Sequence, residues 1–316
     1  MAGMELNGTT VVVTGSGGFL GRYVVQQLEG RGAKVIGVRR RDYDLLSRRE
    51  IDRLLDDAQP QALVHLAAVV GGIGANRAEP GRFFYENARM GIEVIDACHV
   101  AGVAKICIAG TVCAYPKFTP VPFREDDLWV GYPEETNAPY GLAKKMLLVQ
   151  AQAYREQYGT NAIYLLPVNL YGPYDNFDLR SGHVIPSMIR KFVDARDRDR
   201  PHVELWGDGS PTREFLYVRD AAEAFCLALE RYDGPDPVNV GSGREISIRE
   251  LASTVARATG YTGGVVWDTS KPNGQPRRQL ETCRARQAFG FEALTPFERG
   301  IDETVLWYET EGRTLL

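Results

Sequence analysis

A glycine-rich loop placed directly after an apolar run is the feature that most constrains how this chain can fold. Residues 9–14 form a β-branched run, typical of a parallel strand that is buried on both faces. The loop Gly15-Ser16-Gly17-Gly18-Phe19-Leu20-Gly21 follows at once, and a helical pattern continues to about residue 28. Glycines at this spacing permit a tight turn and close packing of helix on strand. The sequence therefore predicts a strand–turn–helix unit whose helix N-terminus can receive an anion.

Apolar runs and helical patterns continue to alternate through the first half of the chain. Ser47-Arg48-Arg49-Glu50 has the form of a capping box and predicts the start of one helix. Regular alternation of this kind indicates an α/β fold of the Rossmann type, a doubly wound parallel sheet with right-handed crossovers. Further strands are predicted at 34–38, 62–66, 105–109 and 162–168, and two long helices at 79–101 and 138–158.

The pattern loosens after about residue 171, where glycine, proline and aspartate break it into shorter pieces. We expect residues 1–170 to form a Rossmann domain and residues 171–316 to form mainly a smaller α/β C-terminal substrate-binding lobe. A helical segment within 215–240 is expected to return to the first domain. The mixed-sign run at 196–200 is expected to be a solvated loop. Helices are predicted at 184–193, 220–231 and 247–259, and strands at 203–206 and 265–267.

The glycine loop between a strand and a helix is the expected setting of a dinucleotide site. Cofactor choice then depends on the end of the second strand, where an acidic residue holds the ribose of NAD and a basic residue accommodates the extra phosphate of NADP. The chain has Arg39-Arg40-Arg41 there, so we expect NADP(H), with NAD as the alternative. The predicted cofactor-binding residues are Gly15, Gly17, Gly18, Phe19, Leu20, Gly21, Arg39 and Arg40, with Asp44 and Leu45 near the adenine.

Composition excludes several other classes of protein. The 316 residues carry a net charge of -4, which does not favour a nucleic-acid or anionic-membrane surface. No apolar run approaches the roughly 20 residues that span a bilayer, and the N-terminus does not resemble a signal peptide. Five cysteines without paired zinc spacing predict a reduced cytoplasmic chain with no metal site. Four of the thiols are interpreted as buried and inert, namely Cys98, Cys107, Cys226 and Cys283.

A tyrosine and a lysine four residues apart provide the candidate chemistry. Tyr140 and Lys144 lie on one face of a predicted helix, and an adjacent ammonium is expected to lower the pKa of the phenol. Such pairs are also common on ordinary surfaces. Thr111 strengthens the interpretation because it follows the fourth strand, at the sheet edge where open α/β sheets bind ligands.

These residues together resemble the catalytic set of the extended short-chain dehydrogenase/reductase superfamily. Longer stretches are similar to one family within it, the GDP-L-fucose synthases, across almost the entire chain. Several ordered matches are far more specific than a glycine loop alone. The similar stretches are 70–76, 113–117, 169–173, 175–179, 183–186, 206–215 and 270–274.

The resemblance implies an activity and a site. Members of that family epimerise C3 and C5 of GDP-4-keto-6-deoxy-D-mannose and then reduce C4 with NADPH. By resemblance, Cys113 and His183 are the acid/base pair, and Thr111, Tyr140 and Lys144 serve the reduction, with the last two also contacting the cofactor. Segments that hold GDP in the family supply the candidate substrate-binding residues Asn169, Val184, Lys191, Trp206 and Arg213. A homodimer through helices 79–101 and 138–158 is implied as well.

Departures from the family leave two alternatives open. Thr111 replaces the usual serine, and Ser181-Gly182 before His183 is looser than the usual Asn-Ser. The same residues would also serve a redox-neutral GDP-mannose 5- or 3,5-epimerase with tightly bound cofactor and transient oxidation at C4. A non-catalytic dinucleotide-binding sensor is the third possibility, which the Tyr140/Lys144 pair disfavours.

Overall fold

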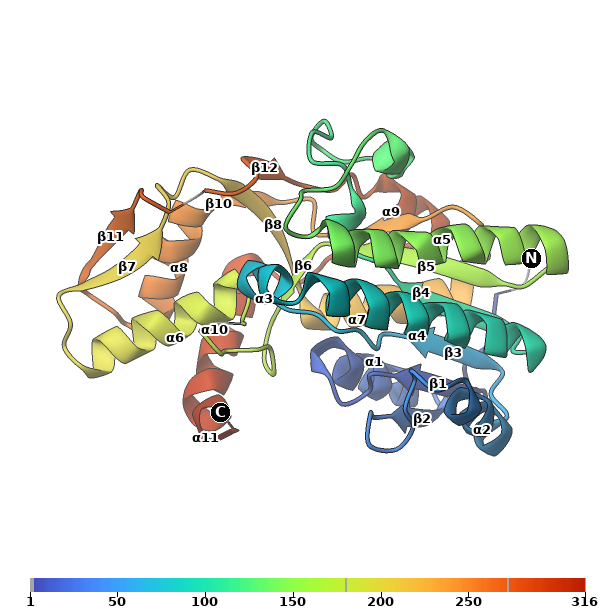
Figure 1. The fold of residues 1–316 in the computed structure, drawn as a ribbon. Helices are drawn as coiled ribbons and strands as arrows, with labels where there is room; N and C mark the ends of the chain where they lie inside the picture. The colour runs from blue at the N-terminus through green and yellow to red at the C-terminus, as the bar shows by residue number, and fades with distance from the viewer. Residues whose placement is uncertain (1–2, 180, 272, 316) are drawn as a thin grey trace.

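Six parallel strands form the central sheet, in the spatial order β2-β1-β3-β4-β5-β9 (Figure 1). The computed structural model describes residues 3–179, 181–271 and 273–315, so Pro272, within the family-like stretch 270–274, lies outside the described residues. The strands are β1 (Thr10–Thr14), β2 (Lys34–Val38), β3 (Ala62–His65), β4 (Lys105–Ala109), β5 (Ala162–Pro167) and β9 (Val238–Val240). The predicted α/β fold with a doubly wound parallel sheet is confirmed.

The order in which successive strands are added to this sheet reverses at β1. The chain runs outward from β1 to β2 and then returns to β3 on the other side of β1. The loops that leave the carboxyl ends of β1 and β3 therefore diverge, which creates the crevice where open α/β sheets bind ligands. The apolar strand predicted at residues 9–14 lies in the middle of this arrangement, and Val11, Val12 and Val13 are fully buried.

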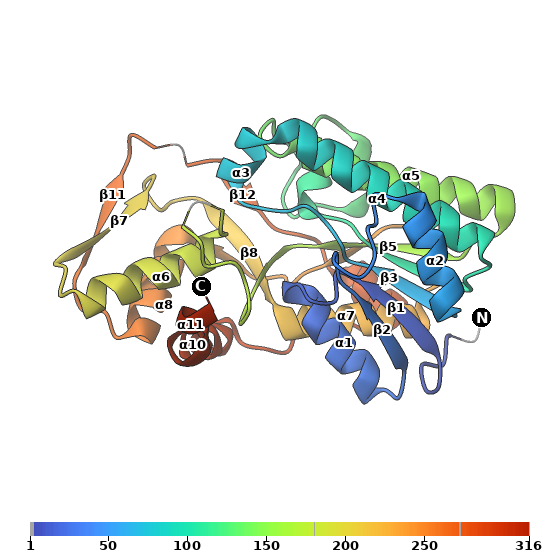
Figure 2. The ribbon, with the colours of Figure 1, turned by 60° about the horizontal axis from the view of Figure 1, so that its bottom comes forward.

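Helices cover both faces of the sheet (Figure 2). Helices α4 and α5 pack on each other and α2 packs on α4, whereas α1 packs on α7 on the opposite face. The bounds are α1 (Phe19–Gly30), α2 (Arg48–Ala58), α3 (Ile73–Ala78), α4 (Pro80–Val100), α5 (Ala138–Tyr158) and α7 (Val218–Arg231), with short 3-10 helices η1 (Val112–Ala114) and η2 (Glu125–Trp129).

A second hydrophobic core lies beyond the end of the sheet and is built from later residues. Strand β8 is its centre and pairs with β6, β10 and β12, while β7 pairs with β11. The strands are β6 (Asn169–Tyr171), β7 (His202–Trp206), β8 (Thr212–Tyr217), β10 (Glu245–Ser247), β11 (Gly264–Asp268) and β12 (Arg277–Arg278). The helices are α6 (Val184–Asp197), α8 (Ile248–Thr259), α10 (Phe297–Trp307), a π-helical turn η3 (Tyr308–Gly312) and α11 (Arg313–Leu315). Helix α9 (Cys283–Phe289) packs instead on α7 and β9 of the first core.

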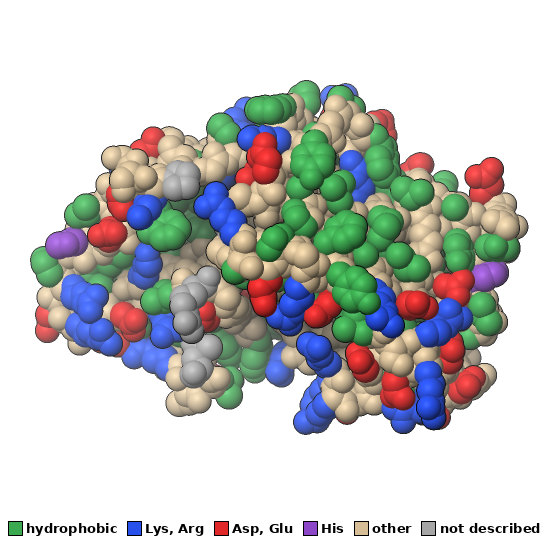
Figure 3. Space-filling model, viewed as in Figure 1, with side chains coloured by type: hydrophobic (Ala, Val, Ile, Leu, Met, Phe, Trp, Pro, Cys, Tyr) green, Lys and Arg blue, Asp and Glu red, His purple; other side chains and the backbone are tan. Residues whose placement is uncertain are grey.

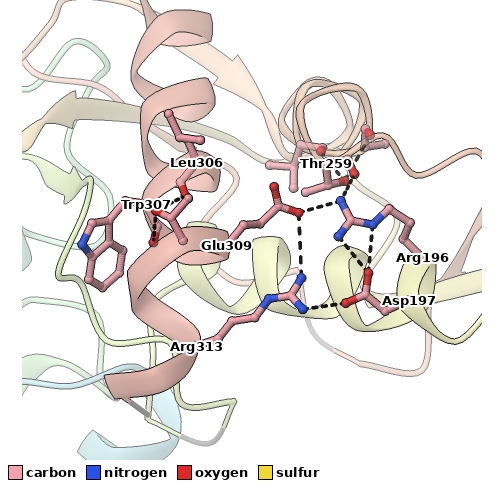
Figure 4. Close-up of polar contacts among 10 residues, drawn as sticks. Arg196, Asp197, Thr259, Leu306, Trp307, Glu309 and Arg313 are labelled. Carbon is pink, nitrogen blue, oxygen red and sulfur yellow. Dashed lines mark hydrogen bonds and ion pairs between the residues drawn. The ribbon is translucent and has the colours of Figure 1, made fainter.

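Two local sequence predictions hold only in part. Ser47 precedes α2 as predicted, but its side chain accepts no capping hydrogen bond, and only its carbonyl oxygen accepts from Glu50 N. The run at 196–200 is not simply a solvated loop, because Arg196 and Asp197 form the last turn of α6. Arg196 donates to the carbonyl of Thr259 and pairs with Glu309 (Figure 4).

Candidate active site

The glycine loop lies at the crevice between β1 and β3. Gly15 has a φ of +72°, and a Cβ there would lie 2.9 Å from the backbone nitrogen of Ala67, which follows β3. A Cβ on Gly21, in the first turn of α1, would lie only 2.1 Å from the carbonyl oxygen of Gly15. Loop and helix therefore pack at a distance that only glycine allows. Gly18 is the N-cap of α1, so the free N–H groups of that helix begin at this loop.

Arg39 extends from the end of β2 over the same loop. A Cβ on Gly17 would lie 3.5 Å from the Cγ and Nε atoms of Arg39. Arg39 and Arg40 are both exposed. Phe19 and Leu20 form the first turn of α1 and pack against the main core. The two predicted adenine-site residues differ in their exposure to solvent. Asp44 is exposed and accepts a hydrogen bond from Leu46 N, while the side chain of Leu45 is buried within the core.

Thr111 and Cys113 follow β4 and meet the first turn of α5. The Thr111 hydroxyl accepts a hydrogen bond from Cys113 N at 3.2 Å and caps η1. A Cβ on Gly141 would lie 2.3 Å from the Cys113 carbonyl oxygen, so the helix backbone rests directly on this turn. The packing brings the neighbouring Tyr140 to Thr111 and Cys113, three side chains that the sequence predicted to act together.

Tyr140 departs from the predicted electrostatics. Its pKa is raised rather than lowered: burial raises the pKa most, Cys113 raises it further, and a hydrogen bond with Thr111 opposes both. The predicted lowering by Lys144 is wrong because desolvation of the phenolate outweighs any help from the ammonium. A raised pKa favours the neutral phenol, which is the form that donates a proton.

Lys144 is a buried amine on the same helix. Its side chain is almost entirely removed from solvent, and burial lowers its pKa to about 8. No hydrogen bond or ion pair to another described residue satisfies its ammonium group. His65, at the carboxyl end of β3, lies close enough that Lys144 adds to the burial that lowers the pKa of His65 to about 3. The neutral His65 ring shares a 3.0 Å hydrogen bond with Thr14.

These features fit a dinucleotide. A buried ammonium without a partner among the described residues requires polar ligand atoms, because burying an unpaired charge is costly. The close-packed glycine turn offers backbone N–H groups at a helix N-terminus, which suits a pyrophosphate. The Arg39 guanidinium beside Gly17 suits an additional phosphate on the ribose.

Arg278 is a site residue that the sequence analysis missed. Its Nη1 points at Cys113 Sγ from 3.9 Å, and its Nε and Nη2 atoms donate to Gln275 Oε1. Strand β12 pairs with β8 so that Arg278 stands beside Arg213, and burial together with Arg278 lowers the pKa of Arg213 to about 10. The two-residue strand β12 had no periodic signal, although it directly follows a family-like stretch.

His183 is the N-cap residue of α6. Its Nδ1 is 3.6 Å from Oδ1 of the buried Asp175, and this nearby carboxylate raises the pKa of His183. The carbonyl of Ser181, two residues earlier, accepts from Gly72 N in the loop after β3. No hydrogen bond or ion pair between described residues joins His183 to Cys113.

The candidate substrate residues are spread over the second lobe. Asn169 Nδ2 donates to the Glu214 carbonyl, Lys191 Nζ to the Glu204 carbonyl, and Arg213 Nη1 to the Thr212 carbonyl. Val184 begins α6 and is exposed. Trp206 ends β7 with 64% of its surface exposed, and the Lys271 ammonium lies 5.9 Å from its ring centre. These contacts do not join all five residues into one cluster.

The remaining cysteines are mostly as predicted. Cys98, Cys107 and Cys226 are buried, and burial raises the pKa of each thiol to about 12. Cys283 is exposed, so its assignment to the buried set is wrong because α9 turns it outward. Within the described part of the chain, no group of three or more His, Cys, Asp or Glu side chains is arranged to hold a metal ion.

Comparison with known proteins gives a consistent result. Residues 11–241 match the model of the NAD dependent epimerase/dehydratase family. The GDP-L-fucose synthase of Sinorhizobium fredii is 41% identical over 296 residues, covering 94% of each chain. A GDP-L-fucose synthetase from Naegleria fowleri bound to NADP superposes with a TM-score of 0.89 at 28% identity, covering 98% of this chain and 96% of that one. A GDP-6-OMe-4-keto-L-xylo-heptose reductase from C. jejuni superposes with a TM-score of 0.90 at 26% identity, covering 98% and 100%.

The fold agrees with these matches. The chain belongs to the NAD-dependent epimerase/dehydratase family, and within it to the group that contains the GDP-L-fucose synthases.

Proposed function

We propose that this protein is a GDP-sugar epimerase-reductase. It epimerises C3 and C5 of a GDP-4-keto-6-deoxy-mannose-type substrate and then reduces C4 with NADPH. The observation that carries the proposal is the packing of Thr111, Cys113 and Tyr140 into one contact cluster beside the buried Lys144. The 41% identity to a GDP-L-fucose synthase supports the substrate class.

Epimerisation requires one group that removes a proton and one that returns it to the opposite face. The C4 ketone acidifies the hydrogens on C3 and C5, so side-chain groups that titrate near neutrality suffice. His183 is the better donor because Asp175 raises its pKa and favours the imidazolium. Cys113 accepts the proton as a thiolate. Proton exchange with water restores both groups before the second carbon reacts.

Reduction uses the Tyr140 end of the site. NADPH, when bound, supplies the hydride that C4 receives. Tyr140 protonates the C4 oxygen, and its raised pKa suits this donor role because the phenol stays neutral at working pH. Thr111 donates a hydrogen bond to the same oxygen, and Lys144 binds the ribose hydroxyls next to the nicotinamide.

Arg39 is proposed to set the preference for NADP(H) over NAD(H). Its guanidinium lies over Gly17, where it can pair with a ribose phosphate. Replacing Arg39 with Gln is expected to reduce kcat/KM for NADPH by about 10- to 100-fold, the range for a lost charge-assisted contact of about 1.5–3 kcal/mol. Parallel assays with NADH should change little. An Arg41→Gln variant is the control, and an equal loss in that variant would contradict the assignment.

The substrate, the assembly and the domain division are proposed together. The proposed GDP-binding lobe is formed mainly by residues 171–316, and the cofactor domain by residues 1–170 and 215–240. The residues proposed to bind GDP are Asn169, Val184, Lys191, Trp206 and Arg213.

Exposed apolar side chains on α4 and α5, such as Phe84, Ile92 and Val149, support a homodimer through those helices (Figure 3). None of the described helices is long and apolar enough to cross a membrane. A cytoplasmic location is proposed.

The test follows absorbance at 340 nm with purified enzyme, NADPH and GDP-4-keto-6-deoxy-D-mannose, with GDP-mannose in a parallel sample. We expect stoichiometric loss of NADPH with the ketosugar and none with GDP-mannose. Conversion of GDP-mannose to an epimer without net NADPH loss would overturn the proposal in favour of a redox-neutral epimerase. Inertness toward the hexose together with turnover of a 4-keto-heptose would correct the sugar and leave the reaction class intact.

A further inference from the structure

Asp175 lies beside His183 in the loop between β6 and α6. Its side chain is only 3% exposed, whereas that of His183 is 45% exposed. Asp175 Oδ1 faces His183 Nδ1 and also accepts a hydrogen bond from Asn176 N at 2.7 Å. The other oxygen, Oδ2, is buried and has no hydrogen-bond partner among the described residues. A buried carboxylate is costly unless neighbouring donors face it, and the His183 ring is the side chain that faces Asp175 through Oδ1.

The backbone that carries Asp175 is held in an unusual conformation. Tyr174, the residue before it, has a φ of +69°, which costs a non-glycine residue on the order of 1–3 kcal/mol. Such a conformation persists only where surrounding contacts impose it. The Tyr174 ring packs on Trp307 at 4.6 Å between centroids, and the Arg22 guanidinium lies 4.9 Å from the Tyr174 ring centre.

Phe177 fixes the other side of Asp175. Its ring stacks on Tyr308 with centroids 4.6 Å apart and an interplanar angle of 10°. Its carbonyl oxygen accepts a hydrogen bond from Arg190 Nη1 at 3.1 Å, which ties the loop to α6. Aromatic residues from one C-terminal segment therefore contact the chain on both sides of Asp175.

Charged groups attach that C-terminal segment to α6 (Figure 4). Arg313 Nη1 donates to Asp197 Oδ2 at 2.7 Å, and Arg196 Nη1 pairs with Glu309 at 2.6 Å. His183 begins the helix that Asp197 ends. The segment Trp307–Arg313, called the C-terminal brace from here on, thus contacts the far end of α6 and the loop that carries Asp175.

We propose that Asp175 is the positioning residue of His183, and that the C-terminal brace holds Asp175 in place for that task. The proposal rests on the proposed epimerisation, in which His183 donates a proton. With Nδ1–H directed at Asp175, the ring orientation is fixed and Nε2 faces away from the loop toward solvent or substrate. Within the described chain, Asp175 is the only charged group that shifts the pKa of His183.

The decisive variant is Asp175→Asn, which keeps the size of the side chain and removes its charge. The four histidines of the chain permit assignment of imidazole signals by NMR, with a His183→Gln variant identifying the signal of interest. We expect the titration midpoint of His183 in the free enzyme to fall in Asp175→Asn. Incorporation of solvent deuterium at C3 and C5 should fall about 10- to 100-fold with KM unchanged, as for partners that orient a functional histidine. Asp302→Asn, an exposed carboxylate on α10, is the matched control.

The brace is tested by Tyr308→Leu, with Leu306→Ala as the control because Leu306 lies two residues away, in the last turn of α10, but is exposed. We expect Tyr308→Leu to lower the His183 midpoint and the deuterium incorporation in the same direction as Asp175→Asn, by a smaller factor. If Tyr308→Leu does not fold, Arg313→Gln provides the same readouts from a partly exposed position. A folded brace variant with wild-type His183 titration would overturn the role of the brace.

The two proposals fail in different ways. The imidazole titration needs no substrate, so an unchanged His183 midpoint in Asp175→Asn would overturn the positioning role even if the enzyme turns over the ketosugar. A lowered midpoint in an enzyme that processes no GDP-ketosugar would instead refute the proposed function and leave the Asp175–His183 pair standing.

Discussion

The two ends of the candidate active site are held in place by different means. At the cofactor end, Thr111 follows strand β4, and Tyr140 and Lys144 lie in the first turns of α5. Close backbone packing at Gly141 holds α5 against the turn that carries Thr111. At the other end, His183 depends on a loop whose conformation is imposed by residues more than a hundred positions later. Short-range geometry therefore supports the residues proposed to carry out the reduction, and long-range packing supports one member of the proposed epimerisation pair.

Tyr140→Phe is expected to give the largest effect and to separate the two ends. Removal of the phenolic proton donor should slow C4 reduction about 10²- to 10⁴-fold, the usual range for general acid catalysis. Solvent deuterium incorporation at C3 and C5 should continue, because Cys113 and His183 are untouched. Stopped-flow NADPH oxidation and mass spectrometry measure the two processes. Tyr132→Phe, an exposed tyrosine, is the control; equal loss of both processes in Tyr140→Phe would mean that the ends are not independent.

Lys144→Met tests how strongly the cofactor end is desolvated. Burial lowers the pKa of Lys144 from 10.5 to about 8, so the unfolded chain binds one more proton than the folded chain between those pH values. Unfolding free energy of the wild type then rises with pH over this window, and below about pH 8 the buried charge destabilises the fold by on the order of 3 kcal/mol. Lys144→Met should be more stable than wild type below pH 8, and the gain should vanish toward pH 10.5. Urea unfolding at several pH values measures this.

A pH-independent stability difference in Lys144→Met would contradict that account. The control is Lys34→Met, an exposed lysine on β2, where no change across this window is expected. Loss of activity in Lys144→Met is expected at every pH, so stability and activity should move in opposite directions. That combination is typical of a functional site that tolerates strain.

The cofactor end was the more predictable from sequence for a physical reason. A strand buried on both faces, a glycine turn and an amphipathic helix each impose a local pattern, so β1, α1 and the positions of Tyr140 and Lys144 were predicted within a few residues. The sign of the Tyr140 pKa shift was not, because it depends on how much water the fold removes. The local sequence pattern predicts where a side chain lies along the fold, but it does not predict how much water surrounds that side chain.

The second lobe was less predictable because its contacts are short and distant in sequence. Strands β10 and β12 have three and two residues, too few for any periodicity. Arg278 reaches Cys113 across 165 positions, and the two aromatic residues that flank Asp175, Tyr174 and Phe177, contact Trp307 and Tyr308. The run at 196–200 was misassigned in part because charge alternation alone does not reveal which side chains find partners.

Trp206→Ala tests the second lobe without disturbing the first. The exposed ring is proposed to stack on the guanine base, and loss of such stacking costs about 1–3 kcal/mol, or roughly 5- to 150-fold in KM for the GDP-sugar. The KM for NADPH and the unfolding free energy should stay unchanged, because the ring is already in solvent. Steady-state kinetics with each substrate varied measures this. Trp129→Ala is the control, and an equal rise in both KM values would place Trp206 outside the nucleotide site.

Arg313→Gln is expected to give the smallest effect and tests the comparison most directly. The Arg313–Asp197 pair joins residues 116 positions apart, whereas Arg82 pairs with Glu79 and Glu86 within one helix. Partly exposed pairs each contribute about 0.2–1 kcal/mol, so both Arg313→Gln and Arg82→Gln should lower the unfolding free energy only slightly. Only Arg313→Gln should speed hydrogen exchange of the backbone amides at residues 174–183, because only that pair closes a long loop onto α6. Equal exchange in both variants would contradict a role of the Arg313–Asp197 contact in holding the loop.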